Sequence, residues 1–283
     1  MKFSSGSNPV VITVPPKATD CHHHIYDARY PVEVNASLRP EDALVSDYRV
    51  LQQRIGTSRN VIVQPSTYGV DNRLLVESLA AFGIENVRGV AVVNTNVTNA
   101  ELQILHEAGV RGIRFNLAQP GTTALEMVRP LAERIAPMGW HIQLNAPADT
   151  LLKAKDLWGD LPLQVVFDHL GRVPQPGALN HPGFAMVREL VQQGKAWVKL
   201  SGFYNESVVG APTYADSVQQ ARIYAREGPD RVVWGSDWPH PTEQDKGWPD
   251  DANLLNLLCE VVPNETARNQ ILVDNPTQLY QFE

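Results

Sequence analysis

Short runs of apolar, mostly β-branched residues recur along the chain, and each is followed by a stretch with the spacing of an amphipathic helix. Most of the runs are continuously apolar rather than alternating, which is typical of parallel strands covered on both faces. The pattern predicts eight strands, at residues 18–26, 60–64, 87–93, 110–115, 140–144, 163–168, 196–200 and 231–234.

The segments between the runs carry helix start and stop signals, with side-chain oxygens before them and glycines after them. Asp71 can cap a helix that stops at Gly83, and Asn99 can cap one that stops at Gly109. The pattern predicts helices at residues 40–55, 73–82, 99–108, 122–138, 182–193, 214–227, 252–261 and 265–273.

Eight strand–helix alternations in 283 residues predict an α/β fold, a single (β/α)₈ TIM-like barrel that forms one domain over residues 1–283. A doubly wound sheet is the alternative, but no Gly-x-Gly-x-x-Gly follows the first strand. The Pro- and Gly-rich stretch 170–183 is interpreted as a long barrel loop rather than a domain boundary.

The first predicted strand ends in Asp20-Cys21-His22-His23-His24. Strand alternation places Asp20, His22 and His24 on one face, and Cys21 and His23 on the other. Two imidazoles on one face can bind a metal or polarise a carbonyl, although a lone His-x-His is more often an ordinary polar strand end. The functional interpretation gains weight because an apolar strand far downstream runs directly into Asp237.

In a barrel of this kind the active site lies at the carboxyl ends of the strands. Polar side chains predicted at that rim are His22, His24, Gln64, Ser66, Tyr68, Arg114, Asn116, Gln143, Asn145, His169, Arg172, Ser201, Tyr204, Asn205, Asp237 and His240. So many polar groups at one rim indicate a binding or catalytic site, although any single one could be a structural polar residue.

Composition narrows the function classes. Hydrophobic residues make up 43% and charged residues 19%, as in a soluble globular protein, and the formal net charge is −7 without a long basic run. We therefore expect no nucleic-acid partner, and no apolar stretch approaches the roughly 20 residues of a membrane span. Two cysteines and no secretory signal predict a cytoplasmic protein, and the sequence leaves homo-oligomerisation open.

The motifs resemble those of the amidohydrolase superfamily, in its branch of 2-pyrone-4,6-dicarboxylate lactonase, sugar-acid lactonases and galactarolactone isomerase. The resemblance rests on His22-x-His24, on residues 110–116 (VRGIRFN), 166–172 (VFDHLGR), 198–202 (VKLSG) and 234–240 (WGSDWPH), and on the terminal Asp274-Asn275-Pro276. It spans nearly the whole chain, and the order and spacing of the motifs are more specific than any one of them.

The chain also departs from the superfamily pattern. Members with two metals usually have a bridging Lys or Glu on strand 4 and a His on strand 5, where this chain has Arg114, Asn116, Gln143 and Asn145. We expect no required metal, with a single zinc on His22, His24 and Asp237 as the alternative. Arginines that the pyrone-dicarboxylate pattern carries are absent after Gly202 and near Pro120.

The resemblance implies a lactone-opening hydrolase acting on a small, carboxylate-bearing lactone such as a sugar-acid, muconolactone-type or pyrone lactone. His22, His24 and His169 would polarise the carbonyl, and Asp237 would act as the general base. Arg114 and Arg172 would hold the carboxylate, and Asn116, Asn145, Ser66, Tyr68, Tyr204 and His240 would contact the rest of the substrate. The loops 26–40, 171–183 and 242–251 would select it.

Three alternatives stay open at this point. The nearest is a lactone isomerase of the galactarolactone type, in which Asp237 or a histidine moves a proton without activating water. A zinc-dependent decarboxylase on the same scaffold is more distant. A sugar-binding barrel without catalysis is the rival from outside enzymology, and the presence of Asp237 with all three histidines speaks against it.

Overall fold

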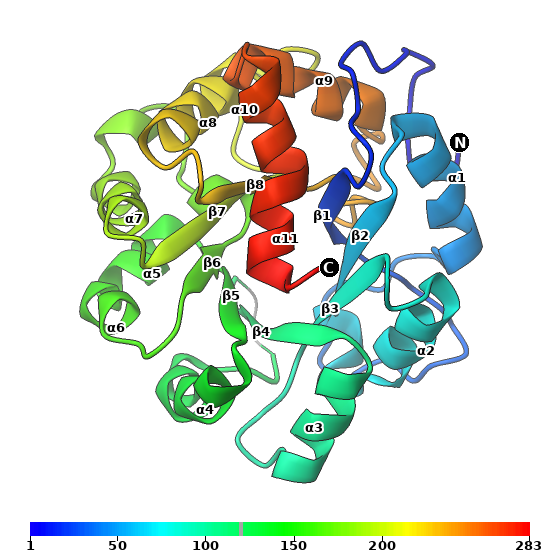
Figure 1. The fold of residues 1–283 in the computed structure, drawn as a ribbon, viewed down its shortest axis with the longest axis vertical. Coiled ribbons are helices and arrows are strands. Elements are labelled where there is room, and N and C mark those ends of the chain that lie inside the picture. Colours follow the sequence, from blue (N-terminus) through cyan, green and yellow to red (C-terminus); the bar gives the residue numbers. More distant parts are fainter. Residues whose placement is uncertain (119–120) are drawn as a thin grey trace.

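The computed structural model describes residues 1–118 and 121–283. Eight parallel strands pair in chain order around a ring. They are β1 (Thr19–His23), β2 (Arg59–Val63), β3 (Val87–Ala91), β4 (Val110–Asn116), β5 (His141–Asn145), β6 (Val165–Phe167), β7 (Ala196–Leu200) and β8 (Val232–Trp234). The predicted (β/α)₈ barrel is confirmed (Figure 1).

Helices surround the ring of strands (Figure 1). They are α1 (Val45–Ile55), α2 (Arg73–Phe82), α3 (Asn99–Glu107), α4 (Val128–Ile135), α5 (Ala148–Lys153), α6 (Lys155–Gly159), α7 (Pro182–Gln192), α8 (Ala215–Glu227), α9 (Asp251–Val261), α10 (Glu265–Asn269) and α11 (Asn275–Tyr280). The sequence pattern did not predict α5, α6 or α11, which are five or six residues long. Helices this short carry too few turns for a clear 3.6-residue period.

β1 contains a bulge that changes which side chains share a face. Asp20 pairs with Asn60 but His23 pairs with Ile62, so β1 has one more residue than β2 between these points. Cys21 consequently packs inside the barrel, while Asp20 and His23 contact Tyr48 of α1 on the outside. The prediction that Asp20 shares a face with His22 and His24, opposite Cys21, was therefore wrong, because strict alternation assumes an unbulged strand.

The carboxyl-terminal segment closes the amino end of the barrel. Leu279, Tyr280 and Phe282 pack against inward-facing residues of several strands, including Val61 and Trp197. In Figure 1, α11 runs across the ring of strands. Access to the barrel is thereby left to the opposite end, where the strands finish.

One glycine on β4 allows a close contact with a histidine of β5 at the amino end of the barrel. A Cβ on Gly112 would lie 2.5 Å from Nε2 of His141, the first residue of β5, so only glycine leaves room for the imidazole ring. The ring of His141 in turn meets Tyr280 at 5.4 Å between centroids. His141 therefore lies at the end away from the predicted site, as its position at the start of the strand suggested.

The ring closes through the residues that follow β8. The amide of Asp237 donates to the carbonyl of His22, and the amide of His24 donates to the carbonyl of Trp238, both at 2.8 Å. Close approach is possible because Gly235 has no side chain, and a Cβ there would lie 2.6 Å from Cβ of His22. Closure therefore brings the two ends of the barrel sequence, with their polar residues, into direct contact.

Among the helices of the described residues, none combines the length and apolar character that crossing a membrane would require.

Candidate active site

Three imidazoles surround one carboxylate oxygen at the carboxyl end of the barrel. Oδ1 of Asp237 lies 3.5 Å from Nε2 of His22, 3.6 Å from Nε2 of His24 and 3.9 Å from Nε2 of His169. All four side chains are nearly or fully buried. The structure therefore brings the four residues predicted as catalytic into one cluster, as strand ends of a barrel should.

Neighbouring groups fix how the imidazoles are oriented. Nδ1 of His24 lies 2.7 Å from the carbonyl oxygen of Val63, and Nδ1 of His22 lies 3.3 Å from Oδ1 of Asp168. Because a carbonyl only accepts, Nδ1 of His24 must carry hydrogen, whereas Nδ1 of His22 also lies 3.4 Å from Nζ of Lys199, which can only donate. His169 differs, since its Nδ1 can accept from the Ser201 hydroxyl at 3.0 Å and leave hydrogen on Nε2.

The Nε2 atoms of His22 and His24 are only 3.3 Å apart. With hydrogen on its Nδ1, His24 presents an Nε2 lone pair that can accept from His22 when the hydrogen of His22 is on Nε2. Burial keeps the pKa of His22 well below its usual value, although Asp168 acts in the opposite direction, and burial lowers that of His169 to about 4. His22 and His169 are therefore neutral imidazoles.

Asp168 lies beneath His22 and gathers three nitrogen groups. Its Oδ2 accepts from Nε of Arg114 at 3.0 Å and from Gln143 at 3.1 Å, while Nζ of Lys199 lies 3.8 Å from Oδ1. Burial opposes ionisation here, but the surrounding positive charges keep the pKa of Asp168 well below its usual value. Asp168 is therefore an anion next to the ring of His22, held in place by Arg114 and Gln143.

A second chain of buried groups holds the other oxygen of Asp237. The Tyr204 hydroxyl donates to Oδ2 at 2.7 Å and lies 2.9 Å from Nδ1 of His240, whose Nε2 is 3.2 Å from both oxygens of Asp251. Burial, followed by the Asp237 charge, raises the pKa of Tyr204 well above its usual value, so the phenol remains a donor. Against burial, Asp251 raises the pKa of His240.

The backbone at three of these residues is strained, one of them His240, whose φ is 55°. Asp237 has φ of 66° and His169 has φ of 50°, in the left-handed region that costs non-glycine residues on the order of 1 kcal/mol. Such a conformation persists only where the surroundings hold it. At Asp237 these include the hydrogen bond from its amide to the carbonyl of His22 and the contacts to its carboxylate.

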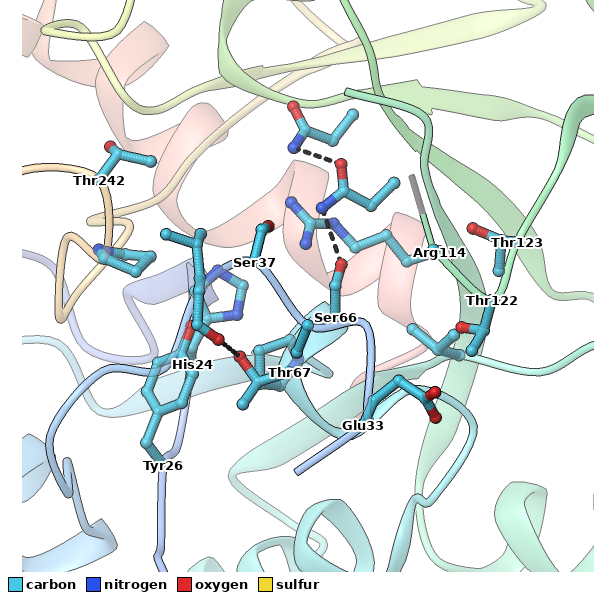
Figure 2. Close-up of a pocket in the computed structure, with 18 of the residues that line it drawn as sticks. His24, Tyr26, Glu33, Ser37, Ser66, Thr67, Arg114, Thr122, Thr123 and Thr242 are labelled. Atoms are coloured by element: carbon cyan, nitrogen blue, oxygen red, sulfur yellow. Dashed lines mark hydrogen bonds between the residues drawn. The ribbon is translucent and has the colours of Figure 1, made fainter. Parts of the chain in front are cut away.

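The cavity above the cluster has a mostly neutral polar wall. The side chain of Asn145 donates to Asn116 at 3.1 Å, and Asn116 donates to Ser66 at 2.7 Å. Figure 2 shows Arg114 and Ser66 in the middle of this cavity, with Tyr26 and Thr242 on one side and Thr122 and Thr123 on the other. Arg172 also lines the cavity, and its Nε donates to Glu206 at 2.7 Å.

Loops cover this cavity unevenly. The segment before α1 contributes most, through Glu33, Asn35, Ala36, Ser37 and Leu38. The other two predicted specificity loops contribute Arg172 and Thr242, and the segment 121–123, which the sequence did not indicate, adds its three residues. Pro120, noted above for a missing arginine, lies outside the described residues.

Three residues predicted to contact substrate have other partners. The Tyr68 hydroxyl accepts from the amide of Asp27 at 2.8 Å and donates to its carbonyl. His240 has no exposed surface and lies behind Tyr204. Tyr204 itself is bound to Asp237, so its hydroxyl is occupied by the cluster.

Sequence reasoning gave no role to Asp168, Lys199, Glu206 or Asp251, although all four contact predicted site residues. For the first two a signal existed: a lysine in the apolar run 196–200 and an aspartate beside His169 are unusual in buried strands. Glu206 lies in the loop after β7 and Asp251 is the first residue of α9, and for these two the sequence offers no signal.

The donor set fits one divalent ion. One ligand atom from each of His22, His24 and Asp237 lies within 4.8 Å of the other two, and the Nε2 atoms of the two histidines face the same place. Two imidazoles and a carboxylate are zinc ligands that leave a position open, as in catalytic sites. His22, Asp168 and His169 form a second such group that shares His22.

Comparisons with known proteins show which family and which relatives the chain resembles. A model of the amidohydrolase family matches residues 19–282. The chain is 35% identical over 279 residues to a 2-pyrone-4,6-dicarboxylate hydrolase of Comamonas testosteroni, covering 94% of this chain and 91% of that protein. It is 34% identical over 282 residues to a 4-sulfomuconolactone hydrolase of Rhizobium radiobacter, covering 97% and 93%.

Among solved structures, one similar protein is a probable 2-pyrone-4,6-dicarboxylic acid hydrolase from Acinetobacter baumannii with citric acid bound. The TM-score is 0.84 and the sequences are 25% identical, with 94% of this chain and 100% of that chain covered. Likeness over whole chains shows that this barrel architecture is shared with these proteins.

Proposed function

The chain belongs to the amidohydrolase family, and from that premise we propose that it is a hydrolase that opens the ring of a small lactone bearing a carboxylate. Lactone hydrolases that are 34–35% identical over almost the whole chain support the reaction class. The observation that carries the mechanism is the contact of Asp237 with His22, His24 and His169 beneath a cavity.

Asp237 acts as the general base in this proposal. Its Oδ1 takes a proton from a water molecule that attacks the lactone carbonyl, and the proton then passes to the ring oxygen as the carbon–oxygen bond breaks. Burial opposes ionisation, but the facing imidazoles keep the pKa of this carboxyl well below its usual value, so it is present as the carboxylate that a general base must be. Positioned bases contribute roughly 10²–10⁴ in rate.

The histidines stabilise the negative charge that develops on the carbonyl oxygen. His169 can donate from Nε2 in its neutral form, because its Nδ1 is served by Ser201. Nε2 of His22 and Nε2 of His24 lie side by side next to Asp237 and would add to the polarisation of the carbonyl. Donors aimed at a developing oxyanion are worth about 10²–10³ each.

One divalent ion, when bound, would be held by His22, His24 and Asp237 and would supply Lewis acidity toward the carbonyl. The steps assigned above to Asp237 and His169 use this chain's own groups. Whether turnover needs the ion is an experimental question, and our sequence-based expectation is that it does not.

Substrate binding is divided between a cation and neutral groups. We propose that Arg114 binds the substrate carboxylate, that Arg172 beside the same cavity is engaged by Glu206, and that Ser66, Asn116 and Asn145 hydrogen-bond the ring substituents. Tyr204 and His240 act through Asp237 rather than on the substrate, and Tyr68 shapes the loop at Asp27.

The partner is therefore a small molecule. A cytoplasmic location remains our proposal, supported by two free cysteines, Cys21 and Cys259, and homo-oligomer formation remains open.

A screen in ¹⁸O-water tests the reaction. Aldono-, aldaro-, muconolactone-type and pyrone lactones are incubated with chelator-treated protein, and products are followed by pH indicator and mass spectrometry. We expect acid release and one ¹⁸O in the product carboxylate. Product of unchanged mass and no label would identify the isomerase, released carbon dioxide the decarboxylase, and binding without turnover the inactive barrel.

A further inference from the structure

The charge of Arg172 is already compensated within the protein. Its Nε donates to Oε1 of Glu206 at 2.7 Å, and its Nη1 donates to Oδ1 of Asn145 at 3.4 Å. Both side chains of the ion pair are about three-quarters buried, so solvent screens the pair less than it would an exposed one. A substrate carboxylate that approached Arg172 would meet Glu206 as well.

Arg114 differs from Arg172 in the charges that surround it. It contacts Asp168, but Lys199 approaches the same carboxylate from the other side, so two cations share one anion. Arg114 also lines the cavity and is itself nearly fully buried. Among Arg114, Lys199 and Asp168 one positive charge is left over, and Arg114 is the member of this group that lines the cavity.

The remaining wall offers no second cation in the part of the chain that the structure describes. Ser66, Asn116 and Asn145 are neutral, and the other charged groups that line the cavity are the acids Glu33 and Asp237, besides the imidazole of His169. A second carboxylate on the substrate would face these acids and Glu206. Like charges at such short range weaken binding.

We propose that Glu206 is a specificity-determining residue that restricts the substrate to lactones with a single carboxylate. This inference rests on the proposed function only in that it calls the substrate a lactone, since the charge pattern applies to any ligand of the cavity. Arg114 binds the one carboxylate, the Ser66–Asn116–Asn145 row binds hydroxyl groups, and Glu206 holds Arg172 away from a second carboxylate.

Two flat aromatic probes test this without any turnover. Benzoate carries one carboxylate and isophthalate carries two, and their affinities are measured by titration calorimetry on the full chain. We expect the wild-type protein to bind benzoate at least as tightly as isophthalate. Isophthalate binding roughly tenfold or more tightly than benzoate would overturn the proposal, and so would failure of benzoate to bind while isophthalate binds.

The Glu206→Gln variant keeps the shape of the side chain and removes its charge. It should raise isophthalate affinity roughly 10- to 100-fold relative to benzoate, the range of a new charge-assisted hydrogen bond. Adding Arg172→Gln should abolish that gain. The matched control is Glu260→Gln, which breaks an exposed ion pair with Arg222 on the outside of the barrel and should leave the ratio unchanged.

An equal rise for both probes, or a gain that survives Arg172→Gln, would contradict the role of Glu206. Failure of the proposed reaction shows separately. A protein that gives the expected binding shift but opens none of the lactones would refute the reaction and support the charge pattern, whereas efficient hydrolysis of 2-pyrone-4,6-dicarboxylate by the wild type would refute the charge pattern alone.

Discussion

Asp237 uses its two carboxylate oxygens differently. Oδ1 faces the three imidazoles, and Oδ2 accepts from the Tyr204 hydroxyl. A carboxylate held in this way can turn little about its bond to Cβ, so the oxygen nearest the histidines keeps its place. Tyr204 therefore positions Asp237, whereas Asp237 and the three imidazoles would contact the reacting atoms.

Asp237→Asn should remove nearly all turnover while the fold survives, because the side chains are almost isosteric. The expected loss in kcat is roughly 10²–10⁴, the contribution of a positioned base. Steady-state kinetics with circular dichroism measures both, and Asp160→Asn, at an exposed ion pair with Arg129, is the control. A variant that kept more than about a tenth of the wild-type rate would show that Asp237 is not the base.

Tyr204→Phe distinguishes positioning from substrate binding. If Tyr204 orients Asp237, kcat should fall about tenfold with little change in KM, the size of one hydrogen bond of about 1.4 kcal/mol. If it bound substrate in both ground and transition states, KM would rise and kcat would stay. Tyr30→Phe, which removes a hydroxyl from an exposed contact with Glu77, serves as the matched control.

Metal content follows from the donors that are present. We expect at most one divalent ion per chain, at His22, His24 and Asp237, because strand 4 offers Arg114 and Asn116 where a bridging ligand would be needed. Elemental analysis of purified protein measures this directly, and His24→Asn should lower the metal content. Two tightly held ions per chain would contradict the prediction.

At the scale of elements, the sequence predicted the strands, which follow from the local hydrophobic pattern, and missed the bulge, which interrupts that pattern. All eight strands were predicted, because continuous apolar runs are a strong signal. The bulge in β1 was not, since nothing in Asp20–His24 marks an extra residue, and it sends Cys21 inward and Asp20 outward. Even so, His22 and His24 share the site.

The first residue of β5 gives a prediction about acid sensitivity. Neither ring nitrogen of His141 has a hydrogen-bond partner among the described residues, and burial lowers its pKa to about 3. Because the folded pKa lies below the ordinary value, this residue stabilises the fold above about pH 6.5 and loses that contribution as the pH falls toward 3.

His141→Met should therefore weaken the acid sensitivity. Between pH 7 and pH 5, the free energy of unfolding of the wild type should fall by about 2 kcal/mol more than that of the variant. Urea unfolding followed by circular dichroism at both values measures the difference. Parallel losses in the two proteins would mean that His141 is not responsible.

At the scale of the whole molecule, the site could be predicted only as far as strand ends determine it. The barrel rule placed His22, His24, His169 and Asp237 together because each follows a strand. Contacts made across the barrel, such as Arg114 with Asp168 or Lys199 with the carbonyl of Cys21, depend on which side chains meet after closure. Single-strand patterns hold no information about such pairs.

A substitution that removes packing at the amino end of the barrel should lower stability and leave catalytic activity unchanged. Phe282 is buried with its ring between Arg59 and Arg88, at 4.8 Å and 4.6 Å from the centroid. Phe282→Ala should lower the free energy of unfolding by about 3 kcal/mol, as for other buried aromatics. Kinetic constants well below the melting temperature should match the wild type, and Val208→Ala, at an exposed valine, is the control.

The hydrogen bonds that close the ring between β1 and the residues after β8 bear on how the protein loses activity. Hydrogen bonds joining Asp237 and Trp238 to His22 and His24 are part of the barrel's closure and also hold catalytic candidates in place. Local opening at these hydrogen bonds would scatter the cluster while most of the hydrophobic interior stayed intact. Heating should then inactivate the enzyme before it melts, and amide hydrogen exchange should begin at these residues ahead of β3 to β6.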